Sequence, residues 1–292
     1  MFERWTEARA GELTALCDAA LPGENLTEDE LRAALWEDGG DGDPTVVLGL
    51  ADGAGAVAGV VHTVGPRRVG FVQLVAVRPD ARRAGVGSAL VAALRDWAFE
   101  GHGAEGLGVG GASPFYLWPG VDVRATAALC LFESLGFHPR GCEVDMSYPT
   151  QHRAAVPAGV TVRRALEEDD VAAGLAFVGR HWPNWVAETR RAIDGGSCHL
   201  GFSDDDDGGA VVGFGCHSVN RLGWLGPMGT DPLRRHGGLG NALLGAIATD
   251  LMAAGLSTVE VAWVGPVGFY ANAAGASVSR TFRTLLLPRS PA

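Results

Sequence analysis

Apolar and polar positions follow the same order in the two halves of the chain. Each half begins with stretches whose apolar residues recur every three or four positions, which is typical of amphipathic helices. These predicted helices span about 3–20 and 25–37 in the first half, and about 166–179 and 182–194 in the second. Two β-type stretches separated by turn residues follow in each half: Thr45–Leu50 and Ala56–Thr63, then Cys198–Phe202 and Ala210–Ser218. The pattern predicts helices followed by a hairpin, twice.

The rest of each half also has matching elements. A third strand (Gly70–Val77; Leu222–Gly229) leads through a glycine-rich turn into a helix (Ser88–Phe99; Asn241–Ala253). A further strand (Gly106–Gly110; Thr258–Val264), a short helix and a last strand (Glu143–Tyr148; Thr281–Leu287) complete it. Helices and hairpins mixed in this order predict an α+β fold, with a mixed, mostly antiparallel sheet in each half.

A sequence repeat supports two tandem domains. Residues 78–90 and 231–243 match at six positions, all 153 residues apart. The matching residues are Pro79, Arg82, Gly85, Gly87, Ala89 and Leu90 with Pro232, Arg235, Gly238, Gly240, Ala242 and Leu243. A period of this size is that of a domain, not of a solenoid repeat. We therefore expect an N-terminal domain over 1–150, a polar linker over 151–159 and a C-terminal domain over 160–292.

Composition narrows the chemistry. All 23 basic residues are arginine, so the chain has no lysine for a Walker-A phosphate loop or a Schiff base. The net charge of −11 argues against non-specific nucleic-acid binding, which needs basic patches, and is compatible with a cationic substrate. The five cysteines are scattered without metal-ligand spacing, so we expect no metal site. His62, His199 and His217 are isolated on strands, and no role is assigned to them.

The termini and apolar runs suggest location. The N-terminus lacks a signal-peptide pattern, and no apolar run is long enough for a membrane span. We expect a soluble, cytoplasmic protein without a membrane partner. The acidic run at 204–207 is interpreted as a hairpin turn, because it lacks the bidentate glutamate of a calcium loop.

The glycine-rich turn carries the clearest chemistry. Residues 82–87 read Arg-Arg-Ala-Gly-Val-Gly between an apolar strand and an amphipathic helix. Such a turn presents free backbone N–H groups at a helix N-terminus, where the helix dipole also favours an anion. The alternative, a glycine turn that merely caps a helix, is weakened by a second copy in the same context. A dinucleotide fingerprint is excluded because leucines, Leu90 and Leu243, occupy the third glycine position.

This Arg-x-x-Gly-x-Gly turn after a strand and a Pro-containing bend resembles the acetyl-CoA-binding motif of the GNAT (general-control-related N-acetyltransferase) superfamily. The order of elements in both halves is similar to that family too, so the resemblance implies two tandem GNAT-type domains and acetyl-CoA as acyl donor. In the family, the turn amides bind the pyrophosphate of coenzyme A, and the preceding strand pairs with the pantetheine.

The resemblance assigns cofactor-binding residues by position. In the first half these are Val75 and Val77 on the strand, with Arg82, Arg83, Ala84, Gly85, Gly87 and Ser88 at the turn. In the second half they are Met228 and Thr230, with Arg235, His236, Gly237, Gly238, Gly240 and Asn241. The second strand departs from the pattern at Pro227, which predicts a bulge or an edge strand, because proline cannot donate to a sheet.

The family often places a tyrosine acid on the short last helix, four residues before a Gly-Phe pair. In the first half Phe132 occupies that position and cannot donate a proton. In the second half Tyr270 precedes Gly275 with one residue more than the pattern. Tyr270 is therefore either the acid or a buried packing residue. Glu260 is a weak candidate base, against the alternative of a carboxylate that faces solvent.

The first half carries about fifteen extra residues near the expected thioester end, around 111–122. This loop holds Phe115, Tyr116 and Trp118 between prolines. It either forms a pocket wall in which Tyr116 acts as an acid, or packs against the other half. Together these features predict an acetyl-CoA-dependent N-acetyltransferase that acts on a small-molecule amine. The alternatives are a non-catalytic acyl-CoA-binding or sensing protein and a scaffold that keeps only the fold.

Overall fold

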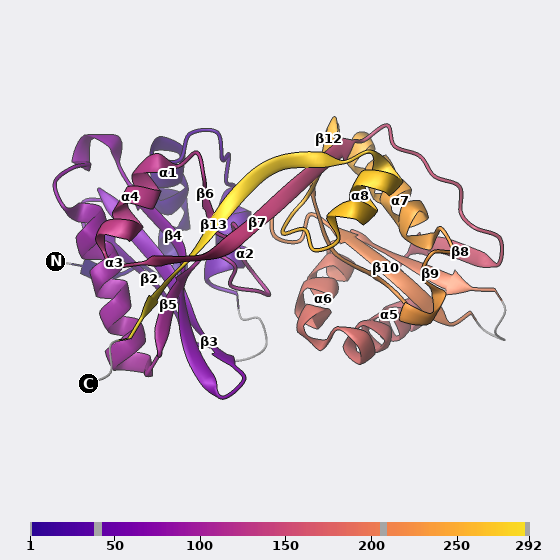
Figure 1. Cartoon of the computed structure of the whole chain (residues 1–292), viewed down its shortest axis with the longest axis horizontal. Helices are drawn as coiled ribbons and strands as arrows, with labels where there is room; N and C mark the ends of the chain where they lie inside the picture. Colours follow the sequence, from indigo (N-terminus) through magenta and orange to yellow (C-terminus); the bar gives the residue numbers. More distant parts are fainter. Residues whose placement is uncertain (1, 38–42, 205–208, 290–292) are drawn as a thin grey trace. The chain divides into compact units, whose positions relative to one another are not determined.

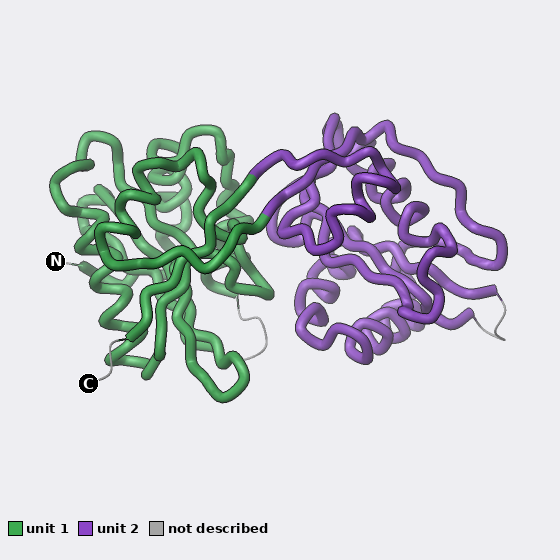
Figure 2. The backbone as a smooth tube through the Cα atoms, in the orientation of Figure 1, with its two compact units in different colours: residues 1–143, 281–292 green, residues 144–280 purple. Residues whose placement is uncertain are grey.

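The computed structural model describes residues 2–37, 43–204 and 209–289. The chain forms two compact units, Met1–Glu143 with Thr281–Ala292 (unit 1) and Val144–Arg280 (unit 2), which Figure 2 shows in green and purple. Residues 205–208, which include most of the predicted acidic hairpin turn, lie outside the described part. Among the described residues no helix is long and apolar enough to span a membrane.

Unit 1 is a twisted sheet with helices on both faces (Figure 1). Its strands lie in the order β1 (Phe2–Arg4), β2 (Thr45–Leu50), β3 (Gly55–Val64), β4 (Arg67–Val77), β5 (Gly106–Val109) and β13 (Ser277–Pro288), and β6 (Val121–Asp122) pairs with β13. Only β4 and β5 are parallel; the other neighbours in this order run antiparallel.

Two apolar layers hold the unit 1 sheet. On one face, α3 (Val86–Asp96) and α4 (Thr126–Ser134) contribute Leu90, Leu94 and Phe132. On the other, α1 (Ala10–Ala20) and α2 (Glu28–Leu35) contribute buried leucines over Leu74 of β4. A capping box starts α2: the Thr27 amide donates to Glu30 and the Glu30 amide donates to the Thr27 hydroxyl.

Unit 2 repeats this plan. Its strands lie in the order β7 (His138–Pro149), β12 (Thr258–Val261), β11 (Trp224–Thr230), β10 (Val211–His217), β9 (Cys198–Ser203) and β8 (Val160–Arg164). Only β11 and β12 are parallel. One face packs on α7 (Leu239–Ala253) and α8 (Val267–Ala274), and the other on α5 (Glu168–His181) and α6 (Val186–Asp194). The α+β class with a mixed sheet is therefore confirmed in both units.

The units exchange their last strands relative to the sequence halves. The chain leaves unit 1 within β7, whose later residues pair with β12, and returns within β13, whose later residues pair with β5. Residues 144–150, expected in the N-terminal domain, thus belong to unit 2, and residues 281–292, expected in the C-terminal domain, belong to unit 1. The helix predicted from residue 3 was wrong at its start, because residues 2–4 pair with β2. The edge strand β8 was missed.

The exchange has a measurable consequence. Leu285 of β13 is 2% exposed and lies in the unit 1 core. Leu285→Ala should lower the stability of unit 1 by about 2–5 kcal/mol, because it leaves a cavity there. Hydrogen exchange should then speed up in β3, β4 and α3, although the mutation is near the C-terminus. Val278→Ala, at an exposed position of the same strand, is the control. If hydrogen exchange became faster only in residues 144–280, the assignment of the later part of β13 to unit 1 would be wrong.

Candidate functional site

In both units a strand leads through a short turn into a helix that begins at a left-handed glycine. Gly85 precedes α3 with φ 80°, and Gly238 precedes α7 with φ 89°. Two residues earlier, Arg83 and His236 are also left-handed, with φ 63° and 68°. The two predicted turns therefore share one backbone path, which a residue with a side chain at the glycine could follow only with strain.

These turns leave amide donors free at the helix starts. The first intrahelical bonds run from the Ala89 amide to the Gly85 carbonyl (3.0 Å) and from the Ala242 amide to the Gly238 carbonyl (3.1 Å). Neither helix has a side-chain cap. The amides of 86–88 and 239–241 are thus the orphan donors of the first turn, and the exposed turns offer them to an anion.

The strand before each turn loses its neighbour on one side. β4 pairs with β5 only as far as Val72, and β11 pairs with β12 only as far as Leu225. Across the described chain, no strand pairs with the remainder of β4 or β11 on that side. The predicted strand positions, Val75 and Val77 in unit 1 and Met228 and Thr230 in unit 2, lie on these open edges. An extended ligand can add to such an edge as a further strand.

A bulge lies where each strand diverges. In unit 1, Ala58 opposes Leu74 and Gly59 opposes Val72, so Gln73 is the extra residue. In unit 2 the register shifts between Gly215 and His217, opposite Gly226-Pro227. Pro227 therefore lies in a bulge of an internal strand. Of the two predictions for this proline, the bulge is observed and the edge strand is not. Gly226 is the position equivalent to Gln73, 153 residues later.

Gln73 fastens the unit 1 bulge to its surroundings. Its Nε2 donates to the carbonyls of Ala34 in α2 (3.2 Å) and Phe115 in the inserted loop (3.1 Å). Its Oε1 is buried and has no hydrogen-bond partner. A buried acceptor without a donor costs about 1–3 kcal/mol, so the bulge holds an acceptor that a ligand N–H could satisfy.

The turns differ in what surrounds them. A Cβ at Gly85 would meet nothing within 4 Å, and one at Gly87 would meet Leu131 of α4 at 3.3 Å. Arg82 donates to the carbonyls of Ala20 (2.8 Å) and Val77 (3.2 Å), so its side chain anchors the turn, and its contact with a phosphate stays a prediction. Arg83 and Ala84 are exposed beside it, and Ser88 is half-buried in the first turn of α3.

The unit 2 turn is more crowded. A Cβ at Gly238 would lie 3.5 Å from Pro157 of the predicted linker, and one at Gly240 would lie 2.9 Å from the Phe269 ring. The Asn241 side chain is already paired with His152 of the linker (2.8 Å). Arg235, His236 and Gly237 are exposed. Pro157 of the linker thus lies beside Gly238, whereas nothing lies within 4 Å of a Cβ at Gly85, and Phe269 of α8 is closer to Gly240 than Leu131 is to Gly87.

The inserted loop packs within unit 1. Leu117 is buried, and with Trp118 it joins the apolar cluster under α1 and α2. The Trp118 indole donates to Glu24 (2.9 Å), just after α1. Tyr116 is half-buried between these anchors, next to the Phe115 carbonyl that accepts from Gln73. Tyr116 thus directly follows Phe115, whose carbonyl accepts a hydrogen bond from Gln73 of the bulge.

Tyr270 lies in the unit 2 core. It is 8% exposed and packs in the cluster formed by α7, α8 and β12. Burial raises the pKa of Tyr270 to about 12. Proton donation from Tyr270 is therefore less favourable than from an ordinary tyrosine, whose pKa is about 10, which supports the packing interpretation. Phe132 of unit 1 is buried against Phe137, with ring centroids 5.1 Å apart.

A buried carboxyl, Asp145 of β7, lies beside Glu260 of β12 and was not anticipated. Asp145 Oδ1 accepts from the Trp263 amide (2.8 Å), while Asp145 Oδ2 and Glu260 Oε1 are buried without hydrogen-bond partners. Glu260 as a whole is half-buried, so its expected exposure to solvent is only partial. Burial raises the pKa of Asp145 to about 7, opposed by the Trp263 amide and reinforced by the charge of Glu260. Strand pairing places Thr284 and Gly108 at the equivalent unit 1 positions.

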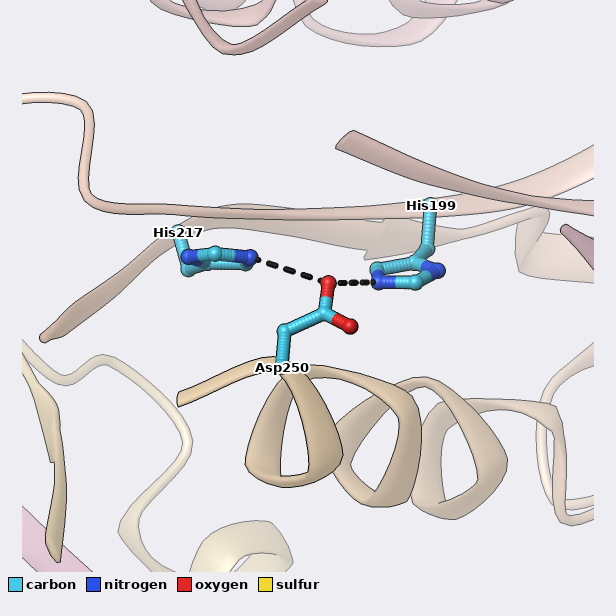
Figure 3. A group of neighbouring side chains, drawn as sticks. All are labelled: His199, His217 and Asp250. Atoms are coloured by element: carbon cyan, nitrogen blue, oxygen red, sulfur yellow. Dashed lines mark hydrogen bonds and ion pairs between the residues drawn. The ribbon is translucent and has the colours of Figure 1, made fainter. Parts of the chain in front are cut away.

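A second group was not anticipated at all. His199 and His217, to which no role was assigned, contact Asp250 of α7 from neighbouring strands (Figure 3). The signal that was overlooked is the repeated dipeptide Cys-His at 198–199 and 216–217, on two strands that pair with each other.

The raised pKa of Asp145 predicts a pH-dependent stability. Unfolded Asp145 loses its proton near pH 3.9, but folded Asp145 keeps it up to about pH 7. The folded state therefore binds more protons between these values, so the free energy of unfolding falls as pH rises through them. Asp145→Asn should remove this fall, about 2–4 kcal/mol between pH 4 and 8, in denaturant titrations.

The exposed Asp18→Asn, on α1, is the matched control and should keep the wild-type pH profile. The assignment would be wrong if Asp145→Asn and wild type lost stability equally over this range.

Comparison with known proteins agrees with this geometry. Residues 12–116 match the sequence model of the acetyltransferase (GNAT) family. No curated protein sequence matches the chain. The structure is similar to a GCN5-related N-acetyltransferase from Sphaerobacter thermophilus (20% identity, TM-score 0.67, covering 100% of this chain and 96% of that one). It is also similar to a tandem GNAT protein of the clavulanic acid biosynthesis pathway (15%, TM-score 0.76, 100% and 99%).

A third similar structure is the GCN5-related glucosamine N-acetyltransferase region of a fungal multi-domain GH3 β-N-acetylglucosaminidase (19% identity, TM-score 0.76). The match covers 98% of this chain but only 38% of the fungal one. At these identities the likeness shows the fold alone. The family match lies in unit 1, and the fold extends the likeness over unit 2. Residues 12–116 therefore match the GNAT family by sequence, and the chain as a whole has the fold of tandem GNAT proteins.

Proposed function

We propose that the protein is an acetyl-CoA-dependent N-acetyltransferase that binds its coenzyme in unit 1 and acetylates the amine of a small molecule. The match of residues 12–116 to the GNAT family model supports acyl transfer from an acyl-CoA in general. The choice of acetyl group, of an amine acceptor and of unit 1 is our inference. A cytoplasmic location and the absence of nucleic-acid and membrane partners remain predictions from the sequence.

The observation that carries the proposal is the open turn at Gly85 next to an open strand edge. Free amides at 86–88 suit the pyrophosphate, and the unpaired edge of Val75–Val77 suits the amide-containing pantetheine arm. Both features occur in unit 2, but there Pro157 and Phe269 crowd the helix start. Unit 1 therefore has the more accessible site.

The unit 1 bulge supplies the requirements of direct attack on a thioester. A backbone N–H of the bulged stretch 73–75 can stabilise the developing oxyanion, as preorganised donors do. The unsatisfied Gln73 Oε1 can accept a hydrogen bond from the incoming amine and orient its lone pair. Tyr116 is the proposed acid for the leaving thiolate. It is half-buried and not in the core, whereas Tyr270 is held in the core of unit 2.

The second candidate, a non-catalytic acyl-CoA-binding protein, is favoured by Phe132, which occupies the family's acid position. The two differ in one assay. An enzyme releases free thiol from acetyl-CoA when an amine panel is added, and a binding module does not.

Coenzyme binding can be tested at the two turns separately. Gly85→Glu should weaken CoA binding about 100-fold in calorimetry, because a carboxylate would meet the pyrophosphate at the orphan amides. Gly85→Ala carries the same backbone strain without the charge and should retain most of the affinity. Gly238→Glu should bind within about threefold of wild type. Circular dichroism checks that each variant folds.

If Gly85→Ala and Gly85→Glu lost the same affinity, repulsion between the carboxylate and the pyrophosphate would not be the cause. If only Gly238→Glu lost affinity for CoA, the coenzyme would bind in unit 2.

The acid can be assigned with two matched variants that each remove one hydroxyl. Tyr116→Phe should lower kcat about 100-fold and leave the KM for acetyl-CoA within about threefold, because a general acid acts on the leaving thiolate and not on binding. Tyr270→Phe should leave kcat within about twofold. A wild-type kcat in Tyr116→Phe together with a large loss in Tyr270→Phe would reverse the assignment.

A further inference from the structure

Two histidines and one aspartate converge inside unit 2, at the end of α7 remote from its glycine turn (Figure 3). His199 lies on β9 opposite Gly215 of β10, and His217 follows Gly215 two residues later. Residues two apart on a strand share a face, so both imidazoles project toward α7. Cys198 and Cys216 oppose each other on the other face of the sheet.

The three side chains face one another at close range. Asp250 Oδ2 lies 2.7 Å from Nε2 of His199 and 3.2 Å from Nε2 of His217. All three potential ligand atoms lie within 4.8 Å of one another. Their side chains are 8%, 11% and 13% exposed for His199, His217 and Asp250, so the group is sheltered but not sealed. Arg164 pairs with the other carboxylate oxygen, Oδ1, at 2.6 Å and leaves Oδ2 to the histidines.

This spacing suits a transition-metal ion. Ligand atoms about 2.0–2.2 Å from zinc lie roughly 3.3 Å apart in a tetrahedron and about 2.9 Å apart at right angles. The 2.7 and 3.2 Å separations therefore need to change by only a few tenths of an ångström, and the two histidine nitrogens, which lie within 4.8 Å of each other, must come to about 3 Å when both bind the ion. Three protein ligands leave a fourth position for solvent, and two imidazoles with one carboxylate are a common donor set for zinc-like ions.

A second hydrogen bond orients one of the imidazoles. The other ring nitrogen of His217, Nδ1, lies 3.1 Å from the Ser218 hydroxyl, which also accepts from the Gly223 amide. An outer hydrogen bond of this kind fixes the ring and presents Nε2 to the ion.

The fold does not require a polar group here. Strand pairing and the 153-residue offset place Leu48, Gly59 and Trp97 of unit 1 where unit 2 has His199, His217 and Asp250. Leu48 and Trp97 pack on the apolar core of unit 1. The same scaffold is therefore stable with an apolar contact at this place, and the polar triad belongs to unit 2 alone.

We propose that His199, His217 and Asp250 form a binding site for one divalent transition-metal ion of the zinc class. The ion would join β9, β10 and α7 through Nε2, Nε2 and Oδ2, while Arg164 keeps its contact with Oδ1. The site uses no residue of the glycine turns, so it stands apart from the proposed acetyltransferase function.

The test uses the full-length protein after chelation, with the exposed Cys130 and Cys142 replaced by serine to remove competing thiols. Titration with Zn²⁺ in a calorimeter should show one equivalent bound, and Zn²⁺ should raise the melting temperature. His217→Gln and Asp250→Asn should each weaken binding at least about 100-fold. His138→Gln, which alters an exposed histidine, is the matched control and should bind as the parent does.

X-ray absorption on the zinc-loaded parent protein covers the case in which a variant does not fold. Two imidazole nitrogens with oxygen ligands are expected. Absence of stoichiometric binding, unchanged affinity in His217→Gln, or a shell with fewer than two imidazoles would overturn the proposal.

Discussion

Strand β4 loses its neighbour β5 after Val72, and the candidate site of unit 1 follows from that separation. Gln73 adds one residue to β4 at this point, so the strand diverges, and residues 75–77 have no neighbouring strand on one side. Beyond it the chain turns through Gly85, whose left-handed conformation lets α3 begin with its free amides exposed. An open edge and an anion-binding helix start are thereby placed in succession on one stretch of chain.

The two units show which parts of this arrangement belong to the backbone and which to the side chains. Bulge, strand divergence and left-handed glycine recur in unit 2 at Gly226-Pro227 and Gly238. The side chains around them do not recur. Unit 2 has Phe269 and Pro157 at its helix start. It also buries Asp145, His199 and His217, whereas unit 1 has small or apolar residues at the equivalent positions. The two units thus share the backbone conformation of the site and differ in the side chains around it.

The sequence predicted the elements whose signal is local. Glycines at a fixed spacing after a strand identified both turns, and Pro227 predicted a bulge or an edge strand, of which the structure has the bulge. Alternation located the central strands within a few residues. Contacts set by tertiary structure could not be predicted from the sequence. The exchange of β7 and β13 depends on which sheet each strand joins, and neither the periodicity of apolar residues nor the composition specifies that sheet. The pairing of His199, His217 and Asp250 likewise depends on strand register and on the position of α7. The burial of Tyr270 depends on how α8 packs.

The central claim is that unit 1 holds the coenzyme at its helix start, and hydrogen–deuterium exchange with and without CoA tests it most directly. Each amide that binds a phosphate oxygen should exchange more slowly. The account predicts CoA-dependent protection of residues 82–90 and of the β4 segment before them, with no comparable change at 235–243. Protection confined to 235–243, or none in either turn at saturating CoA, would contradict it.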